Sequence, residues 1–413
     1  MKRLIMITTL LLTILLLSFE STAACGGLFC QNSPVDQNAE RIIFTQNRDG
    51  TITAIIQIQY TGFAEDFSWI LPLPNAITAA ALEVPETAMN AFIELETNTT
   101  PRFIAPPLPR CAQTFDFEFG LGSDMAVMEA PAAGEVQIFA SGEVGPFGFD
   151  VIGSEDPNAL INWLRDNNYR VEPPMEPLIN VYVEEKFVFL AMKLLPNQGV
   201  QDIQPIQVTY PSQKPMIPLR LTAVAANPDM AVLTWFFADS QAIPQNYAHM
   251  EIYDHEITFF SFGSHNYRQL LGERANEFGG HAFITEYAQP SHQMTFNDPL
   301  LQELSGRFAY LTRLNTVISP EEMTVDPVFD YDPQRKDVSN IHDLSDAVGL
   351  YDCERENGVR IRNVSSLNNL PATAINEPQS SGFTTGLLVG VGGVVVLAAL
   401  LGLGIAIGRR SRS

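Results

Sequence analysis

The longest uncharged segment of the chain lies near its C-terminus and limits where a water-exposed fold can form. Residues 386–408 are only Gly, Leu, Val, Ala and Ile. A helix of about 20 such residues crosses the hydrocarbon core of a bilayer. The tail 409–413 contains Arg409, Arg410 and Arg412, and the positive-inside rule places such a tail in the cytoplasm. The sequence therefore predicts one C-terminal transmembrane helix, with the preceding chain outside the cell.

Small residues recur four positions apart within this segment. Gly386 and Gly390 form one such pair, and Gly404 and Gly408 form another. Small-xxx-small spacing lets two membrane helices approach closely, so an oligomer formed through these glycines is one interpretation. A single glycine-rich anchor without a partner helix is the other.

The N-terminus has the features of a secretory signal peptide. Lys2 and Arg3 precede an apolar run over 4–17, and small residues follow up to Ala24. A basic start, a short apolar run and small residues before a cleavage site are typical of signal peptides. We therefore predict a signal peptide at 1–24. Cleavage there would make Cys25 the first residue, so lipid attachment at Cys25 is an alternative, although Thr22 stands where a lipobox usually has Leu.

The segment before the predicted anchor allows a second form of attachment. Residues 370–374 read Leu-Pro-Ala-Thr-Ala, which resembles a sortase signal with Ala in place of Gly. A sortase-processed wall protein is therefore an alternative to a permanent anchor. The surrounding segment 330–385 is polar and acidic, rich in Ser and Asn, and we interpret it as a surface segment that continues into a stalk.

Composition excludes some classes of function. The chain has 24 Lys plus Arg against 47 Asp plus Glu, a formal charge of −23, while 46% of its residues are hydrophobic. So much apolar side chain argues against disorder. The acidic balance argues against nucleic-acid binding. The exported part is more acidic than the whole chain, because five basic residues lie in the two terminal segments.

All four cysteines lie in the exported part of the chain. An even number of cysteines in an oxidising compartment predicts two disulfides, with three possible connectivities. We favour Cys25 with Cys30 and Cys111 with Cys353. A metal site is the weaker interpretation, because the chain has no C-x-x-C pair.

Alternating residues predict a strand-dominated fold for 25–329. Residues 41–46 and 51–60 flank a turn ending in Asp49-Gly50, and Ile52, Ala54 and Ile56 share one face of the second run. Period two around such a turn predicts a β-hairpin with one buried face. Further strands are predicted at the following ranges: 67–71, 134–140, 181–194, 201–210, 219–225 and 231–238.

Helices are predicted to be fewer and short. Ala88, Met89, Phe92 and Ile93 recur at helical spacing. Ser154 is expected to cap a helix over 155–167, and 267–277 is a third candidate. Prolines over 98–110 predict a loop or a domain seam. The fold class is therefore α+β, an antiparallel sheet or sandwich with a few short helices.

Five of the six histidines fall between His249 and His292. Besides these two they are His255, His265 and His281. His255-Glu256 begins like a zincin motif, but Phe259 stands where the second zinc ligand is required. A metal site assembled from several of these histidines in three dimensions stays as an alternative to ordinary surface histidines.

The remaining motifs for catalysis or ligand binding are incomplete. Gly263-Ser264-His265 is not a G-x-S-x-G elbow, and Gly120-Leu121-Gly122 lacks the third glycine of a dinucleotide fingerprint. Asp330 and Asp332 begin like a calcium loop, but Arg335 replaces its glycine, which leaves only looser surface calcium binding. We therefore predict no cofactor, the catalytic residues stay unknown, and an enzyme is the less favoured interpretation.

Several segments together resemble a known bacterial family. They include 25–30 (CGGLFC), 34–37 (PVDQ), 40–42 (ERI), 67–74 (FSWILPLP), 145–147 (GPF), 163–164 (WL), 285–287 (TEY), 312–314 (TRL) and 319–323 (SPEEM). The chain resembles the uncharacterised "domain of unknown function 2330" family of exported proteins. The resemblance implies a secreted or C-terminally anchored bacterial protein and brings no catalytic residue. Within it, Arg313 near Glu321 and Glu322 suggests an internal ion pair.

Three hypotheses for function follow. The first is a membrane-anchored cell-envelope protein with a binding or structural role and no enzymatic activity. The second is an extracytoplasmic metal-assisted hydrolase that uses histidines between His249 and His292. The third is a sortase-processed wall protein.

Overall fold

The computed structural model describes residues 28–30, 35–62, 67–107, 135–169, 171–260, 264–347, 351–353 and 359–361. All of them belong to one compact unit, Met1–Val364. No helix within these ranges is both long and apolar enough to cross a membrane. The predicted signal peptide 1–24 and the predicted span 386–408 lie outside the described residues.

Eight strands form the larger sheet, in the order β13-β14-β15-β11-β2-β3-β10-β5. Their bounds, in chain order, are β2 Val35–Gln46, β3 Thr51–Gly62, β5 Leu82–Glu83, β10 Ile206–Pro211, β11 Ala226–Ala238, β13 Ala248–His249, β14 Ala282–Pro290 and β15 Tyr310–Ile318. Strands β2 and β11 pair in parallel, as do β13 and β14, and the other pairs are antiparallel.

The predicted hairpin is confirmed as β2 and β3. Ile42 lies opposite Ile56 in the antiparallel register. The turn closes with the Asn47 amide donating to the Thr51 carbonyl at 2.9 Å. Gly50 has a φ of +84°, a left-handed conformation that costs glycine little.

Five strands form the smaller sheet, in the order β1-β4-β9-β8-β7. They are β1 Leu28–Cys30, β4 Phe67–Leu73, β7 Gln137–Val144, β8 Phe147–Gly153 and β9 Val188–Leu194. All of its neighbouring strands are antiparallel.

A continuous hydrophobic core lies between the two sheets. Phe44 and Ile56 of the larger sheet belong to the same buried cluster as Leu71 and Leu190 of the smaller sheet. Each sheet also carries buried apolar residues on its outer face, such as Phe189 on the smaller sheet and Trp235 on the larger sheet. Helices pack against part of each outer face, giving an order of helix, sheet, sheet and helix.

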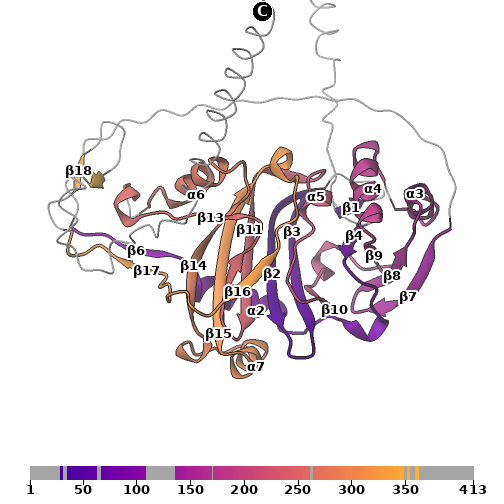
Figure 1. Ribbon diagram of the computed structural model, residues 1–413, viewed down its shortest axis with the longest axis horizontal. Helices are drawn as coiled ribbons and strands as arrows, with labels where there is room; N and C mark the ends of the chain where they lie inside the picture. Colours follow the sequence, from indigo (N-terminus) through magenta and orange to yellow (C-terminus); the bar gives the residue numbers. More distant parts are fainter. Residues whose placement is uncertain are drawn as a thin grey trace, which may run out of the picture. The chain divides into compact units, whose positions relative to one another are not determined.

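The helices differ in the sheet that they cover. On the smaller sheet, α3 (Pro157–Asp166) and α4 (Glu176–Glu184) pack against Ile152 and Phe189, and Figure 1 shows both helices beside β8 and β9. On the larger sheet, α2 (Ala88–Thr99) and α7 (Pro299–Arg307) pack against its outer residues. Within the described residues, the other two helices are α5 (Leu219–Thr222) and α6 (Tyr267–Asn276).

Short strand pairs and turns complete the described residues. The pairs are β12 (Gln241–Pro244) with β16 (Phe329–Asp332), β6 (Arg102–Ile104) with β17 (Ile341–Asp343), and β18 (Tyr351–Cys353) with β19 (Val359–Ile361). The 3-10 turns are Ala79–Ala81, Pro173–Met175, Val200–Asp202, Asp254–Glu256, Ser291–Gln293 and Pro320–Glu322. Part of the segment after 329 therefore pairs with earlier strands.

The strand-dominated α+β fold is confirmed, but the larger sheet is mixed rather than antiparallel, because β2 and β11 pair in parallel, as do β13 and β14. Three local predictions are also wrong. The predicted strand 181–194 is helix α4 followed by β9, because Pro177 starts a helix whose buried face includes Tyr182. The predicted strand 219–225 contains α5. Helix α3 is capped by Asp156, which accepts from the Asn158 amide at 2.9 Å, rather than by Ser154.

Candidate functional site

The five clustered histidines have separate surroundings. The His249 Nε2 atom lies 2.8 Å from the Thr285 hydroxyl, and the His281 Nε2 atom lies 2.8 Å from the Glu322 carbonyl. The His255 ring stacks on Tyr253. Within the described residues, no three His, Cys, Asp or Glu side chains come together in a way that could hold a metal ion. The structure therefore does not assemble the proposed histidine site.

The other two histidines of the set are also apart. The His265 ring contacts Phe103 edge-on, with centroids 4.8 Å apart. His292 lies in the 3-10 turn Ser291–Gln293. The sixth histidine, His342, also stacks on the Phe103 ring, with centroids 4.5 Å apart, and its Nδ1 atom lies 2.6 Å from the Asp254 carboxylate.

Arg313 forms a buried ion pair, but with a different partner from the one the sequence suggested. Its Nε atom lies 2.5 Å from the Glu286 carboxylate, whereas Glu322 accepts from the Ser319 amide. The pairing register shifts between Thr285 and Tyr287. Glu286 lies at this irregularity, which is a common device for redirecting a side chain.

The Glu286 carboxylate is fully supplied with donors. The Tyr267 hydroxyl donates to it at 2.7 Å and the Asn315 amide at 2.8 Å. Arg313 also donates to the Thr100 hydroxyl at 2.9 Å, at the end of α2. Glu286 and Arg313 are each 3% exposed. These bonds account for the buried charges, so the cluster has a structural explanation.

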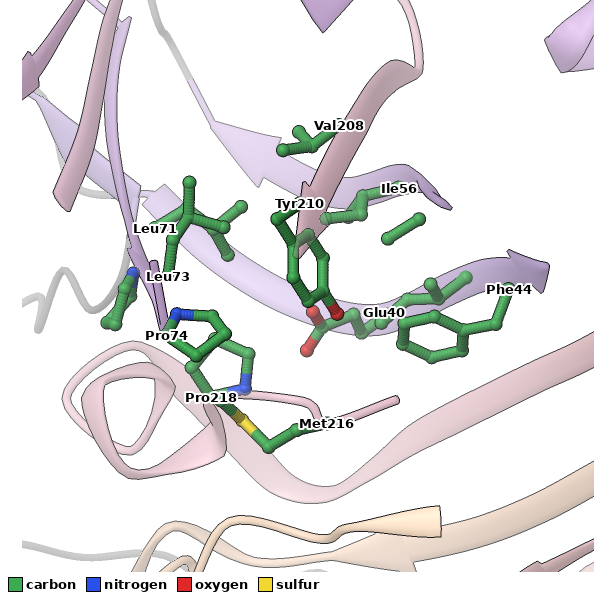
Figure 2. Close-up of a pocket in the computed structure, with 13 residues that line it drawn as sticks. Glu40, Phe44, Ile56, Leu71, Leu73, Pro74, Val208, Tyr210, Met216 and Pro218 are labelled. Carbon is green, nitrogen blue, oxygen red and sulfur yellow. The ribbon is translucent and has the colours of Figure 1, made fainter. Parts of the chain in front are cut away.

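Glu40 is the second buried glutamate of the larger sheet, and it lies on the opposite face. It occupies the same face of β2 as Ile42 and Phe44, because side chains on one face recur every second residue. Its side chain is 5% exposed and points into a cavity between the two sheets. Figure 2 shows the carboxyl group of Glu40 and the hydroxyl of Tyr210 both turned into this cavity.

The cavity is narrow and mostly apolar. The residues that line it are Glu40, Ile42, Phe44, Ala54, Ile56, Leu71, Pro72, Leu73, Pro74, Val208, Tyr210, Met216 and Pro218. The space open to the centre of a water molecule is about 20 Å³, which is enough for one ordered water or a group of similar size. The half-buried residues Pro74, Met216 and Pro218 form its outer edge.

Glu40 lacks the partners that Glu286 has. No ion pair found among the described residues includes Glu40, and its Oε2 atom is buried without a hydrogen-bond partner. Burial raises the pKa of Glu40 to about 7, with a smaller contribution from the negative charge of Asp326. Near neutral pH this carboxyl is therefore balanced between its acid and its anion.

Asp326 is held close by and is well supplied with donors. The Arg220 guanidinium lies 2.7 Å from its carboxylate, and the Tyr182 hydroxyl donates to it at 2.9 Å. Burial raises the pKa of Asp326, and the bonds from Arg220 oppose that rise. A guanidinium, a hydroxyl and a backbone amide on one carboxylate favour its charged form. Asp326 therefore contributes a second negative charge near the cavity.

The outer edge of the cavity is tied to the segment that carries Asp326. The Ile217 amide donates to the Pro327 carbonyl at 3.1 Å, and the Phe329 amide donates to the Pro215 carbonyl at 2.9 Å. These bonds join the segment around Met216 to the residues immediately after Asp326. The cavity wall and the charge near Glu40 thus belong to one connected piece of structure.

A larger groove lies on the outer face of the larger sheet, beside α7. Thr45, Thr53 and Thr209 form a row across β2, β3 and β10, because Thr53 lies opposite both of the others. Asn47 and Arg307 also line the groove. Its volume is about 720 Å³. We call this surface the threonine groove.

The polar groups of the threonine groove form an ordered surface. The Thr53 and Thr209 hydroxyls lie 2.9 Å apart, and the Asn47 amide donates to Thr53 at 2.9 Å. Opposite charges share the lining, with Arg48 and Arg307 against Asp49, Glu83 and Glu303. The groove is therefore less acidic than the chain as a whole.

Sequence reasoning did not single out Glu40 or the threonine groove. An acidic residue in phase with Ile42 and Phe44 was the available signal for Glu40, because the alternation places it on the buried face. The pattern of the hairpin did place Thr51 and Thr53 on the opposite face from Ile52. The sequence could not show which part of that face the helices leave uncovered.

The disulfide predictions are not tested. Cys25 and Cys111 lie outside the described residues, and only the backbone of Cys30 and Cys353 is described, in β1 and β18. Both pairings remain predictions.

Comparison with known proteins agrees with the family resemblance. The fold defines an α+β protein built on two facing sheets. A family model described as an uncharacterized protein conserved in bacteria (DUF2330) matches residues 19–330. The chain therefore belongs to this family. No curated protein and no solved structure matches it.

Proposed function

We propose that this chain is an exported bacterial cell-envelope protein, held in the membrane by residues 386–408, whose two-sheet domain binds a polar polymer outside the cell. The apolar segments at the two ends support the export and the anchor. The threonine groove is the observation that supports a binding role, because it is an ordered polar surface left open beside α7.

The lining of the groove favours a neutral, hydroxyl-rich partner such as an envelope polysaccharide. Threonine hydroxyls and the side-chain amide of Asn47 both donate and accept hydrogen bonds. A chain of formal charge −23 repels polyanions, while the mixed charges of the groove do not require a charged partner. The alternative of a metal-assisted hydrolase has no support from the positions of the five histidines.

Binding of the purified full-length chain to isolated wall polysaccharide and to neutral oligosaccharides tests the binding role. The double variant Thr53→Val/Thr209→Val removes two groove hydroxyls with little change in shape, and we expect at least tenfold weaker binding. Thr97→Val is the matched control, because Thr97 is exposed on α2 away from the groove. Equal binding by both variants and the wild type would contradict the proposal.

The proposed export and membrane attachment require a separate experiment. Protease added to intact spheroplasts should digest the domain while leaving a C-terminal fragment in the membrane. Mass spectrometry of the mature protein should find the tail 409–413. Loss of the tail would instead support the sortase-processed form, and a lipid on Cys25 would support the lipoprotein form.

A further inference from the structure

The unpartnered carboxyl oxygen of Glu40 indicates a missing partner. Buried polar atoms are nearly always hydrogen-bonded in proteins, because leaving one without a partner is costly. Glu40 is buried on the inner face of β2, and its Oε2 atom has no hydrogen-bond partner in the structure. The atom belongs to a side chain that lines the cavity, and Figure 2 shows its carboxyl group beside the Tyr210 hydroxyl.

The charges around the cavity select a cation that donates hydrogen bonds. A carboxylate can only accept them, and the negative charge of Asp326 acts on Glu40 from nearby. Divalent ions such as calcium bind six to eight oxygen atoms. Among the lining side chains, only Glu40 and Tyr210 supply oxygen, so the site is too poor in ligands for such an ion.

The size and the lining of the cavity further restrict which cation can bind there. The cavity offers about 20 Å³ to the centre of a water-sized group. This space accommodates one ammonium group but not a quaternary amine. The rings of Phe44 and Tyr210 line the cavity, and aromatic faces attract cations. Toward the outer edge the lining is Pro74, Met216 and Pro218, which suits a short alkyl chain.

We propose that the Glu40 cavity is a binding site for a primary ammonium group carried on a short, unbranched alkyl stem. The ammonium donates to the Glu40 carboxylate, and its stem passes between Pro74 and Met216. This site is independent of the threonine groove, so either one can fail without the other.

Binding is coupled to a proton. When Glu40 is protonated, the ammonium must displace that proton, which is released to water. Because the pKa of Glu40 is about 7, apparent affinity rises about tenfold per pH unit below pH 7 and levels off above it. Two titratable groups from neighbouring elements face Glu40, namely Asp326 and Tyr210. Arg220 acts on Glu40 indirectly, through its ion pair with Asp326.

Titration calorimetry of the full-length chain with methylammonium chloride tests the site. Ligands with so few non-hydrogen atoms bind at about millimolar affinity at best, so the titration extends to about 100-fold that range with ionic strength held constant by NaCl. We expect saturable binding at pH 8, weaker binding at pH 6, and no saturation with tetramethylammonium or potassium. Amine buffers are omitted.

Two further measurements separate Glu40 from the other acidic groups. Glu40→Gln should abolish saturation, whereas Glu143→Gln, on the exposed strand β7, should leave it unchanged. In the wild type, titrations at pH 6 in two buffers of different ionisation enthalpy should show nearly one proton released per ligand. This readout needs no variant. Absence of saturation, equal binding of potassium, retention of binding in Glu40→Gln, or no proton release would each overturn the proposal.

Discussion

Glu40 and Glu286 are buried glutamates on opposite faces of the same sheet, and they differ in their partners. Glu286 receives bonds from Arg313, Tyr267 and Asn315 on the outer face. Glu40 faces the core between the sheets, with one oxygen unpartnered beside a cavity. Burial penalises both carboxylates, but only Glu286 has a cation and two neutral donors to offset that penalty.

This difference separates a structural group from one available for binding. Around Glu286 every strong donor is already provided by the fold, so a ligand would have to displace protein groups. Around Glu40 the protein provides a negative neighbour and apolar walls, which leave the carboxyl balanced between two protonation states. Substitutions that remove one charge at a time can test this contrast.

The largest effect is expected from removing the cation of the satisfied pair. Arg313→Leu leaves Glu286 buried without its cation and should lower the free energy of unfolding by about 3–5 kcal/mol. Urea unfolding followed by tryptophan fluorescence measures this, because Trp235 lies beside Arg313. Arg268→Leu, an exposed arginine on α6, is the control and should change stability by less than about 0.5 kcal/mol.

A second substitution at the same pair distinguishes charge from packing. Adding Glu286→Met to Arg313→Leu should recover part of the loss, because a buried pair can be replaced by apolar residues at low cost. If Arg313→Leu alone costs less than about 1 kcal/mol, the pair is not buried in the way described and the contrast with Glu40 fails.

Glu40→Gln should raise the free energy of unfolding, whereas Arg313→Leu should lower it. The pKa of Glu40 is raised from 4.5 to about 7 in the fold, so its contribution is favourable below pH 4.5 and is lost as the pH rises to 7. The loss is about 3 kcal/mol. Glu40→Gln should therefore be more stable than the wild type by up to that amount at pH 8, and similar to it at pH 4.5.

The measurement is urea unfolding from pH 4.5 to 8 in buffers free of amines. Glu143→Gln serves as the control, since an exposed carboxyl should show no such gain. A Glu40→Gln variant less stable than the wild type at pH 8 would show that the Glu40 carboxylate has a partner after all.

His249 should make the free energy of unfolding depend on pH in the direction opposite to Glu40, so that stability is lost as the pH falls. Burial lowers its pKa from 6.5 to about 4, so its contribution is present above pH 6.5 and is lost as the pH falls to 4. The loss is up to about 3 kcal/mol. Because Glu40 gains stability over much of the same range, the wild type should change little between pH 4.5 and 6.5.

Single substitutions should expose the two opposing slopes. His249→Gln should grow more stable as the pH falls from 7 to 4.5, whereas Glu40→Gln should grow less stable. His292→Gln is the control, because His292 is exposed. Parallel pH profiles for the two variants would contradict the assignment of opposite slopes to these residues.

Local patterns predicted the hairpin well because its determinants lie within a few residues. Alternation over 51–56 and the turn at Gly50 set both the strands and the buried face. Helix α4 was missed because Ile179, Val181 and Val183 are β-branched residues that favour strands, although Pro177 starts the helix. Here packing against the smaller sheet overrides local preference.

The sites were harder to predict because they depend on pairing register. Glu286 meets Arg313 through an irregularity between neighbouring strands, which no spacing in the sequence indicates. Histidines close in the sequence between His249 and His292 belong to different elements, so their number gave no information about proximity. The sequence does indicate that Glu40 and Ile42 share one face of a strand. The lack of a partner for Glu40, however, depends on segments more than a hundred residues away.

The smallest change in stability is expected from removing an exposed carboxyl, which is the reference for the buried carboxylates Glu40 and Glu286. Glu303 lies one helical turn before Arg307 on α7, 3.1 Å from its guanidinium, and both side chains are more than half exposed. Water and salt screen such a pair, so Glu303→Gln should lower the free energy of unfolding by only about 0.3–0.5 kcal/mol. Unfolding at 50 mM and 500 mM NaCl should show this small difference disappearing at high salt, while the effect of Arg313→Leu persists. A salt-independent loss larger than about 1 kcal/mol would mean that burial is not what separates Glu40 and Glu286 from the surface carboxylates.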